Sequence, residues 1–252
     1  MNIYRGIIYD ASISNDNDHL VRVLNNKDAR KLIDTPHEQF VFNGFGMAFE
    51  SQYRIPIHAA AELGRLSNIH TLIKYGSSAI NTHDQSTKTP LHYASMGGHT
   101  DVVDALIGYG ASTEVKDSSG NTPLHMAIKF NHYATTKKLI IHNKNIIDIV
   151  DYSGHTPLYY ALCNNNRNIV KLLKSLGTNV NLKYDKLTNN ETALLSEPIS
   201  EKDIVKTRYD IYFGKPLYVR LLDTLSATEP IQRLYQHRGI VQASSPCICT
   251  IH

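Results

Sequence analysis

Hydrophobic residues recur along this chain in pairs of short runs with helical spacing, separated by polar loops. Leu91 and Ala94 lie on one face of a first run, and a second run continues through Val102, Val103, Leu106 and Ile107. Spacings of three and four residues predict two short helices. The pattern returns every 33 or 34 residues, with prolines at 56, 90, 123 and 157. A fixed period of this size predicts a stacked repeat array, since no single unit could bury its apolar face alone.

Each predicted unit also carries signals for where its helices begin and end. Thr89 can cap a helix that begins at Pro90, because a first-turn residue needs no backbone N–H. Gly110 is expected to end the second helix in a left-handed conformation, and Asn143 can fill the same position. The polar segment 117–121 then predicts a turn that leads into the next unit.

Histidine is abundant, but five of the thirteen histidines follow the repeat. His92 lies in the first turn of its predicted helix, where its ring can bond to the backbone of a neighbouring loop. His58 and His125 share this position, and His99 and His132 share a second one. We therefore interpret all five as structural residues rather than as catalytic groups or metal ligands.

The repeated residues resemble the ankyrin repeat. The resemblance implies an all-α solenoid of stacked helix-turn-helix units with projecting loops, and it implies a protein-binding function. Ile55, Tyr159 and Asn143 depart from the family pattern, in place of Thr, His and Gly. The residues that carry the resemblance best are Thr89-Pro90-Leu91-His92-Tyr93-Ala94, Gly98-His99, Val102-Val103, Leu106-Ile107 and Gly110-Ala111.

The repeat period divides the chain into five parts. Residues 8–24 align with 91–107 without a gap, and asparagine is common before residue 211 but absent after it. The tail is therefore either a separate C-terminal module or an accidental extension after a change of reading frame. The expected parts are a degenerate N-terminal repeat (1–25), an inserted loop (26–53), four well-formed repeats (54–182), a degenerate C-terminal repeat (183–210) and a divergent tail (211–252).

Composition argues against several other classes of protein. The formal net charge is only +3 and no block of Lys and Arg occurs, so nucleic-acid binding is poorly supported. No stretch approaches 18 apolar residues, and the first twenty residues contain no apolar run. We therefore expect neither a membrane span nor a secretory signal. The three cysteines suggest a reducing compartment.

Motifs that could support catalysis are incomplete. Cys247 and Cys249 are too closely spaced for a normal zinc pair, and there is no second pair. The segment 44–46 is half of a phosphate loop without the Lys-Ser/Thr ending. Cys163 occupies a usually exposed repeat position with no local motif for a nucleophile. We expect no enzyme activity, no cofactor and no metal site.

The ankyrin resemblance implies that loop tips and the exposed ends of the first helices contact the partner. Several of the residues in these positions are aromatic or apolar, as interface centres favour. The alternative is that each is merely a tolerated exposed residue. The candidate partner-binding residues are Met96, Ser118, Ser119, Asn121, Lys129, Phe130, Tyr152 and His155.

A finer resemblance concerns the style of the repeats, which are rich in Asn, Ile, Lys and Tyr. The chain is similar to the ankyrin proteins of poxviruses, which implies a truncated host-interaction factor that binds a host protein in the host cytoplasm or nucleus. Members of that family often end in an F-box-like segment that recruits a ubiquitin ligase. Residues 215–217 match such a segment poorly, which argues against ligase recruitment. A non-functional remnant of a longer adaptor remains an alternative, whereas an enzyme or a nucleic-acid binder is disfavoured.

Overall fold

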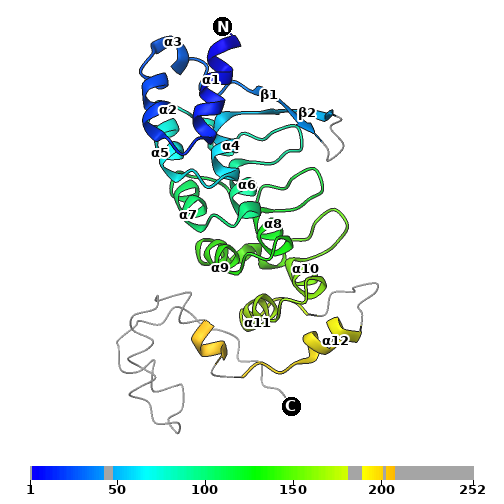
Figure 1. Ribbon diagram of the computed structural model, residues 1–252. Coiled ribbons are helices and arrows are strands. Elements are labelled where there is room, and N and C mark those ends of the chain that lie inside the picture. The colour runs from blue at the N-terminus through cyan, green and yellow to red at the C-terminus, as the bar shows by residue number, and fades with distance from the viewer. Residues whose placement is uncertain (1, 43–47, 181–188, 201–202, 208–252) are drawn as a thin grey trace, which may run out of the picture.

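Helix pairs stack into a single elongated column in the computed structural model, which describes residues 2–42, 48–180, 189–200 and 203–207. Figure 1 shows the column with the N-terminus at one end and loops projecting from one side. The helices are α1 (Asn2–Ile13), α2 (Asn17–Leu24), α3 (Lys27–Arg30), α4 (Pro56–Glu62), α5 (Leu66–Lys74), α6 (Pro90–Gly97), α7 (Thr100–Gly108), α8 (Pro123–Lys129), α9 (Tyr133–His142), α10 (Pro157–Cys163), α11 (Arg167–Ser175) and α12 (Asn189–Ser196), with 3₁₀ turns η1 (Ala79–Asn81) and η2 (Lys144–Asp148).

The four predicted repeats are confirmed as helix pairs, α4–α5, α6–α7, α8–α9 and α10–α11. The first member of each pair lies beside the loops and is called the inner helix here, and the second is called the outer helix (Figure 1). Inner helices pack on inner helices, and outer helices on outer helices, along the column. This is the arrangement that the sequence period predicts for units that share one core.

The inner helices begin as the Thr-Pro signal predicts. Thr89 has an extended backbone, Pro90 occupies the first turn, and Thr89 forms a capping box with His92. Thr122 and His125 repeat this arrangement in the next unit. Three outer helices are followed by left-handed glycines, with φ of +105° at Gly76, +93° at Gly110 and +82° at Gly177. A side chain would strain the backbone in that region, which explains why glycine marks the period.

The prediction that Asn143 forms a left-handed cap is wrong. Its φ is −146°, so its backbone is extended, and the 3₁₀ turn η2 follows directly. Helix α9 has ten residues where α7 and α11 have nine, so Asn143 follows its helix directly, whereas Gly110 and Gly177 are each the second residue after theirs. Its side chain accepts from the Asn145 N–H and donates to Thr113 Oγ1 and Glu114 Oε1.

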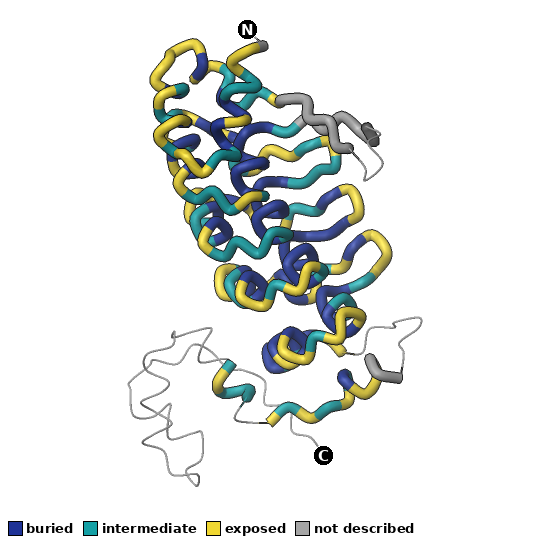
Figure 2. The backbone as a smooth tube through the Cα atoms, viewed as in Figure 1, coloured by how far each residue is buried: buried dark blue, intermediate teal, exposed yellow. Residues whose placement is uncertain are grey.

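A continuous apolar core runs between the inner and outer helices. Leu91, Leu106 and Leu124 are completely buried, and Leu158 and Leu172 of the fourth repeat are 0% and 2% exposed. Figure 2 shows this buried interior, with exposed residues gathered at the loop tips and helix ends. Burying a leucine side chain contributes about 1.5–3 kcal/mol, so the shared core is the main source of stability.

The N-terminal part extends the column by one helix pair. Helices α1 and α2 pack against each other, α1 packs on α4, and α2 packs on α5. The Asn68 side chain fixes this junction by donating to the carbonyl oxygens of Ala11, Ser12 and Ser14. These two helices lie within residues 1–25, where the sequence predicts a degenerate repeat.

The segment 26–53 is not simply an inserted loop. It contains α3, the strand β1 (His37–Phe42) and most of the strand β2 (Ala48–Arg54), which pair antiparallel from His37 opposite Arg54 to Phe42 opposite Ala48. The Arg54 guanidinium forms an ion pair with Glu62 and lies 4.4 Å from the centre of the Tyr93 ring. These contacts join the end of the hairpin to the first and second repeats.

The C-terminal end of the described chain is less regular. Helix α12 contains the predicted repeat start 192–195 and contacts α10 and α11. Lys174 Nζ donates to the Leu195 and Glu197 carbonyl oxygens at 2.6 and 2.7 Å, and Arg167 pairs with Glu197. The predicted tail at 211–252, with Cys247 and Cys249, and the 44–46 segment lie outside the described residues.

Candidate protein-binding surface

Three loops project beside the inner helices, at 82–89, 111–122 and 149–156, and are called the finger loops. Each turns around an aspartate. The Asp117 Oδ1 atom accepts the backbone N–H groups of Ser119 and Asn121 at 2.9 and 2.8 Å. Asp84 and Asp151 accept two backbone N–H groups in the same way. Asp117 and Asp151 are only 3% and 5% exposed, so their carboxylates hold the turns and do not face solvent.

Histidine rings join each inner helix to the next finger loop. The His92 Nε2 atom lies 3.0 Å from the Asn121 carbonyl oxygen, while its Nδ1 accepts from the Thr89 N–H. His58 and His125 make equivalent contacts with the Thr82 and His155 carbonyl oxygens, at 2.9 and 3.3 Å. The prediction that these rings bond to loop backbone is confirmed.

Burial lowers the pKa of these imidazoles, because the charged form would lose its hydration. The pKa of His58 and of His125 falls to about 4, and that of His92 is also lowered. A neutral ring accepts at Nδ1 and donates at Nε2, which is the pattern that the second and third repeats require. His58 Nδ1 has no partner, because Ile55 replaces the threonine whose hydroxyl contacts Nδ1 in those repeats.

A second set of histidines connects neighbouring repeats at the helix turn. His99 Nε2 lies 2.8 Å from the Glu62 carbonyl oxygen, and His132 Nε2 lies 2.9 Å from the Met96 carbonyl oxygen. Gly98 faces the His132 ring so closely that an added Cβ would lie 2.4 Å from Nδ1. All five repeat-phase histidines therefore have structural roles.

Four of the eight candidate partner-binding residues are exposed. Tyr152 is 70% exposed at a finger-loop tip, and Phe130 is 51% exposed at the end of α8. Ser118 and Ser119 are exposed at the tip of the preceding finger loop. The Tyr152 N–H donates to the Ser119 carbonyl oxygen at 3.1 Å, which places these two tips side by side. Large aromatic side chains in this setting are suited to contact another protein.

Two candidates are less accessible than their assignment to loop tips and exposed helix ends predicted. Asn121 is 3% exposed, and its amide binds the Asp117 carboxylate, so it stabilises its own loop. Met96 is half-buried and packs against the apolar core. Repeat phase locates both residues correctly along their elements, but it does not reveal that neighbouring residues cover them.

Lys129 and His155 belong to an aromatic cluster that sequence analysis did not identify as a unit. The Lys129 ammonium group donates to Asn121 Oδ1 at 2.6 Å and lies 4.0 Å from the centre of the Tyr160 ring. His155 stacks on Tyr159 with ring centres 4.0 Å apart. The sequence did offer a signal for this cluster. Tyr159 and Tyr160 are adjacent, and Tyr159 takes the position of the repeat histidine.

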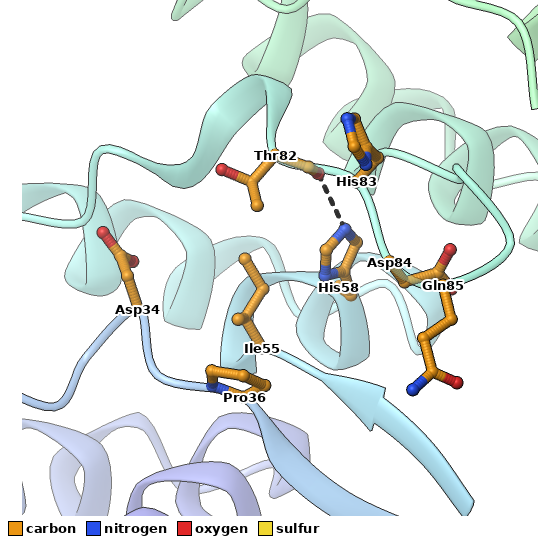
Figure 3. Close-up of a pocket in the computed structure, with 8 residues that line it drawn as sticks. All are labelled: Asp34, Pro36, Ile55, His58, Thr82, His83, Asp84 and Gln85. Atoms are coloured by element: carbon orange, nitrogen blue, oxygen red, sulfur yellow. Dashed lines mark hydrogen bonds between the residues drawn. The ribbon is translucent and has the colours of Figure 1, made fainter.

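A hollow of about 350 Å³ lies beside the first finger loop (Figure 3). His58 and Asp84 line it from the repeats, and Asp34 and Pro36 line it from the segment after α3. Both carboxylates are already engaged, Asp34 by Ser77 and Ser78 and Asp84 by backbone N–H groups. The His58 Nε2 atom is engaged by Thr82, as the dashed line in Figure 3 shows. The hollow therefore offers little unsatisfied polarity to a small ligand.

The described residues give no support for a metal site or a membrane-spanning helix. No group of three or more His, Cys, Asp or Glu side chains in that part of the chain is arranged to hold a metal ion. Within the same residues, none of the helices combines the length and apolar character needed to cross a membrane. Cys163 is exposed, in agreement with its predicted repeat position.

Several known proteins are similar in sequence to part of this chain. NF-kappa-B inhibitor alpha from Homo sapiens is 33% identical over 114 residues, which is 43% of this chain and 36% of that protein. Rabankyrin-5 from Mus musculus is 26% identical over 140 residues, or 55% of this chain and 12% of that protein. ARF GTPase-activating protein GIT2, also from Mus musculus, is 33% identical over 84 residues, or 33% of this chain and 12% of that protein. The chain thus matches about a third or less of each of these relatives.

The family comparison covers most of the chain. The model described as "Ankyrin repeats (3 copies)" matches residues 9–117 and again 98–184. These ranges include the four helix pairs, the finger loops and both sets of histidines. Ankyrin repeats generally mediate protein–protein interaction and are typically not enzymatic. On this match, and on the helix pairs that it spans, the chain belongs to the ankyrin-repeat family.

Proposed function

We propose that this chain is a protein-binding module that holds a partner protein on its finger surface, defined as the three finger loops and the ends of α6, α8 and α10 beside them. The observation that carries the proposal is the exposure of large aromatic side chains there, Tyr152 at 70% and Phe130 at 51%, on a rigid stack of repeats. Rigid elements that present aromatic side chains lose little conformational entropy on binding.

The proposed partner is a host-cell protein, and the proposed setting is the host cytoplasm or nucleus. This finer proposal rests on the similarity of the repeats to poxvirus ankyrin proteins. A role in recruiting a ubiquitin ligase is not part of it, because residues 215–217 match an F-box-like start poorly.

Affinity capture from host-cell lysate, followed by mass spectrometry, tests the function. The wild-type chain should capture a specific protein. A Phe130→Ala/Tyr152→Ala variant should keep its helical circular dichroism and lose most of the capture, because truncation of interface aromatics costs about 2 kcal/mol or more each. A Tyr109→Ala/Ile141→Ala variant is the matched control, since these residues are 44% and 40% exposed, directly after α7 and on α9.

Two further outcomes decide between this proposal and its alternative. Removal of residues 211–252 should leave capture intact if the repeats alone hold the partner. If the wild type captures nothing specific from several host lysates, the chain is better explained as a remnant of a longer adaptor.

A further inference from the structure

The charged groups of the finger loops are distributed unequally between the buried interior and the accessible surface. The aspartates at 84, 117 and 151 all accept backbone N–H groups of their own turns. Glu114 is exposed, but its carboxylate is bound by Asn143, which follows an outer helix. A partner that reaches the finger surface therefore meets few carboxylates that lack hydrogen-bond partners within the chain.

Lys88 and Lys116 differ from these carboxylates. Both are partly exposed, and neither forms an ion pair with another described residue. The Lys116 ammonium group lies 5.7 Å from the centre of the Tyr152 ring, so a cation and the most exposed aromatic of the finger loops lie together. An unpaired ammonium group beside an exposed aromatic is a suitable contact for a carboxylate with an apolar neighbour.

Lys129 has a different role, because its charge is already used. Its ammonium group is held by Asn121 Oδ1 and by the Tyr160 ring. Burial lowers its pKa, and Asp151 and Asp117 act in the opposite direction. Lys129 therefore adds positive charge beneath the surface, but it is not available as a primary contact.

Two histidines lie close enough to these lysines and aspartates for the charges to affect their pKa. Burial is the main cause of the lowered pKa of His92 and His125. Asp117 raises the pKa of His92 and Asp151 raises that of His125, while Lys88 at His92 and Lys129 and Lys116 at His125 lower these pKa values by smaller amounts. Lys88 and Lys116 thus lie within electrostatic range of the starts of α6 and α8.

From this distribution we infer that the finger surface binds an extended acidic segment of the partner protein, with its carboxylates paired to Lys88 and Lys116 and an apolar side chain against Tyr152. This inference rests on the proposed function and specifies the chemistry of the partner. Direct pairing of accessible lysines with carboxylates favours an acidic partner over a basic one. A nucleic acid fits less well, because two unpaired lysines above buried carboxylates neutralise few phosphates.

A binding experiment with defined probes tests the inference. The probe is a fluorescein-labelled peptide of repeated Glu-Ala-Glu-Phe units, compared with a Lys-Ala-Lys-Phe peptide and an oligothymidylate by fluorescence anisotropy. The acidic peptide should bind the full chain, more weakly as salt rises toward about 0.15 M, where screening shortens the range of the attraction. The basic peptide and the oligonucleotide should bind far less.

Charge reversal locates the contact. A Lys88→Glu/Lys116→Glu variant should weaken binding of the acidic peptide about tenfold or more, because two attractions become repulsions. A Lys74→Glu/Lys171→Glu variant has the same change in net charge on the outer helices, where both lysines are exposed, and should bind within about twofold of wild type. Matching circular dichroism spectra show that each variant is folded.

Several results would overturn the inference. They are no binding of the acidic peptide, equal binding of the basic peptide or the oligonucleotide, and equal weakening by the outer-helix variant. The proposed function would survive these results if lysate capture still depended on Phe130 and Tyr152. It would fail separately if no specific partner were captured at all.

Discussion

The outer helices and the finger surface use their polar side chains differently. On the outer side, polar groups connect one repeat to the next: His70 contacts the Tyr109 hydroxyl at 2.8 Å, and Asp104 binds both Lys138 and His142 from the following unit. On the finger side, Lys88 and Lys116 form no ion pair with a described residue, and Tyr152 is 70% exposed. These outer polar groups stabilise the stack, whereas in the proposed function Lys88, Lys116 and Tyr152 are the finger groups that contact a partner.

The largest expected effect concerns the core beneath both surfaces. Leu106→Ala and Leu172→Ala should each lower the free energy of unfolding by about 2–5 kcal/mol, because each leaves a cavity between repeats. Both side chains are almost completely buried, at 0% and 2% exposure. Chemical denaturation measures the effect. A cost near that of a surface substitution would mean that the outer helices are rotated from the described arrangement.

Acid should weaken the histidine contacts beneath the finger surface. The unfolded pKa of histidine is about 6.5, whereas folding lowers it to about 4 at His58 and His125. The stabilisation is therefore complete above about pH 6.5 and is lost as the pH falls toward about 4, by up to about 3 kcal/mol for each ring.

Denaturation at several pH values checks this expectation. The free energy of unfolding should fall through the window between these two pKa values, and a His125→Asn variant should show a shallower fall. A stability that stays constant from pH 6.5 to pH 4 would show that the rings are not held in the neutral form.

A smaller effect is expected from the outer ion pairs. Asp104 is partly exposed, so Asp104→Ala should cost about 0.5–1 kcal/mol, and added salt should reduce the difference from wild type. Lys171→Ala, an exposed change on the outer helix α11, provides the control. If Asp104→Ala lowers the free energy of unfolding no more than that control does, the outer ion pairs do not stabilise the stack.

The smallest effect on stability is expected at a finger-loop tip. Ser118→Ala should change the free energy of unfolding by roughly 0.5 kcal/mol or less. The contact that joins this tip to the preceding finger loop is made by the Ser118 backbone N–H, which donates to the Ser86 carbonyl oxygen at 3.0 Å and is retained in the variant. Thermal or chemical denaturation would reveal a larger loss if the side chain itself stabilised the loop.

The fold was predictable because its signals are local and repeated. Thr89-Pro90 starts a helix and Gly110 ends one through conformational preferences that need no distant partner. Asn143 shows the limit of this reasoning. Its residue type permits a left-handed cap, but its amide is satisfied by Thr113 and Glu114 instead.

The candidate surface was only partly predictable, because accessibility depends on neighbouring elements. Repeat phase correctly predicted that Phe130 and Tyr152 are exposed, because no neighbouring element covers these positions. It did not reveal that the Asp117 turn buries Asn121, or that Lys116 lies beside Tyr152 from another finger loop. The strands before α4 were also missed, since that segment has no counterpart in the repeat.

Cross-linking of the captured complex directly locates the interface, because lysines are present on both surfaces. Lys88 and Lys116 lie on the finger loops, whereas Lys74 and Lys171 are exposed on the outer helices. With an amine-reactive cross-linker and mass spectrometry, the partner should be joined mainly to Lys88 and Lys116. A partner joined mainly to Lys74 and Lys171 would place the interface on the outer helices and would contradict the account.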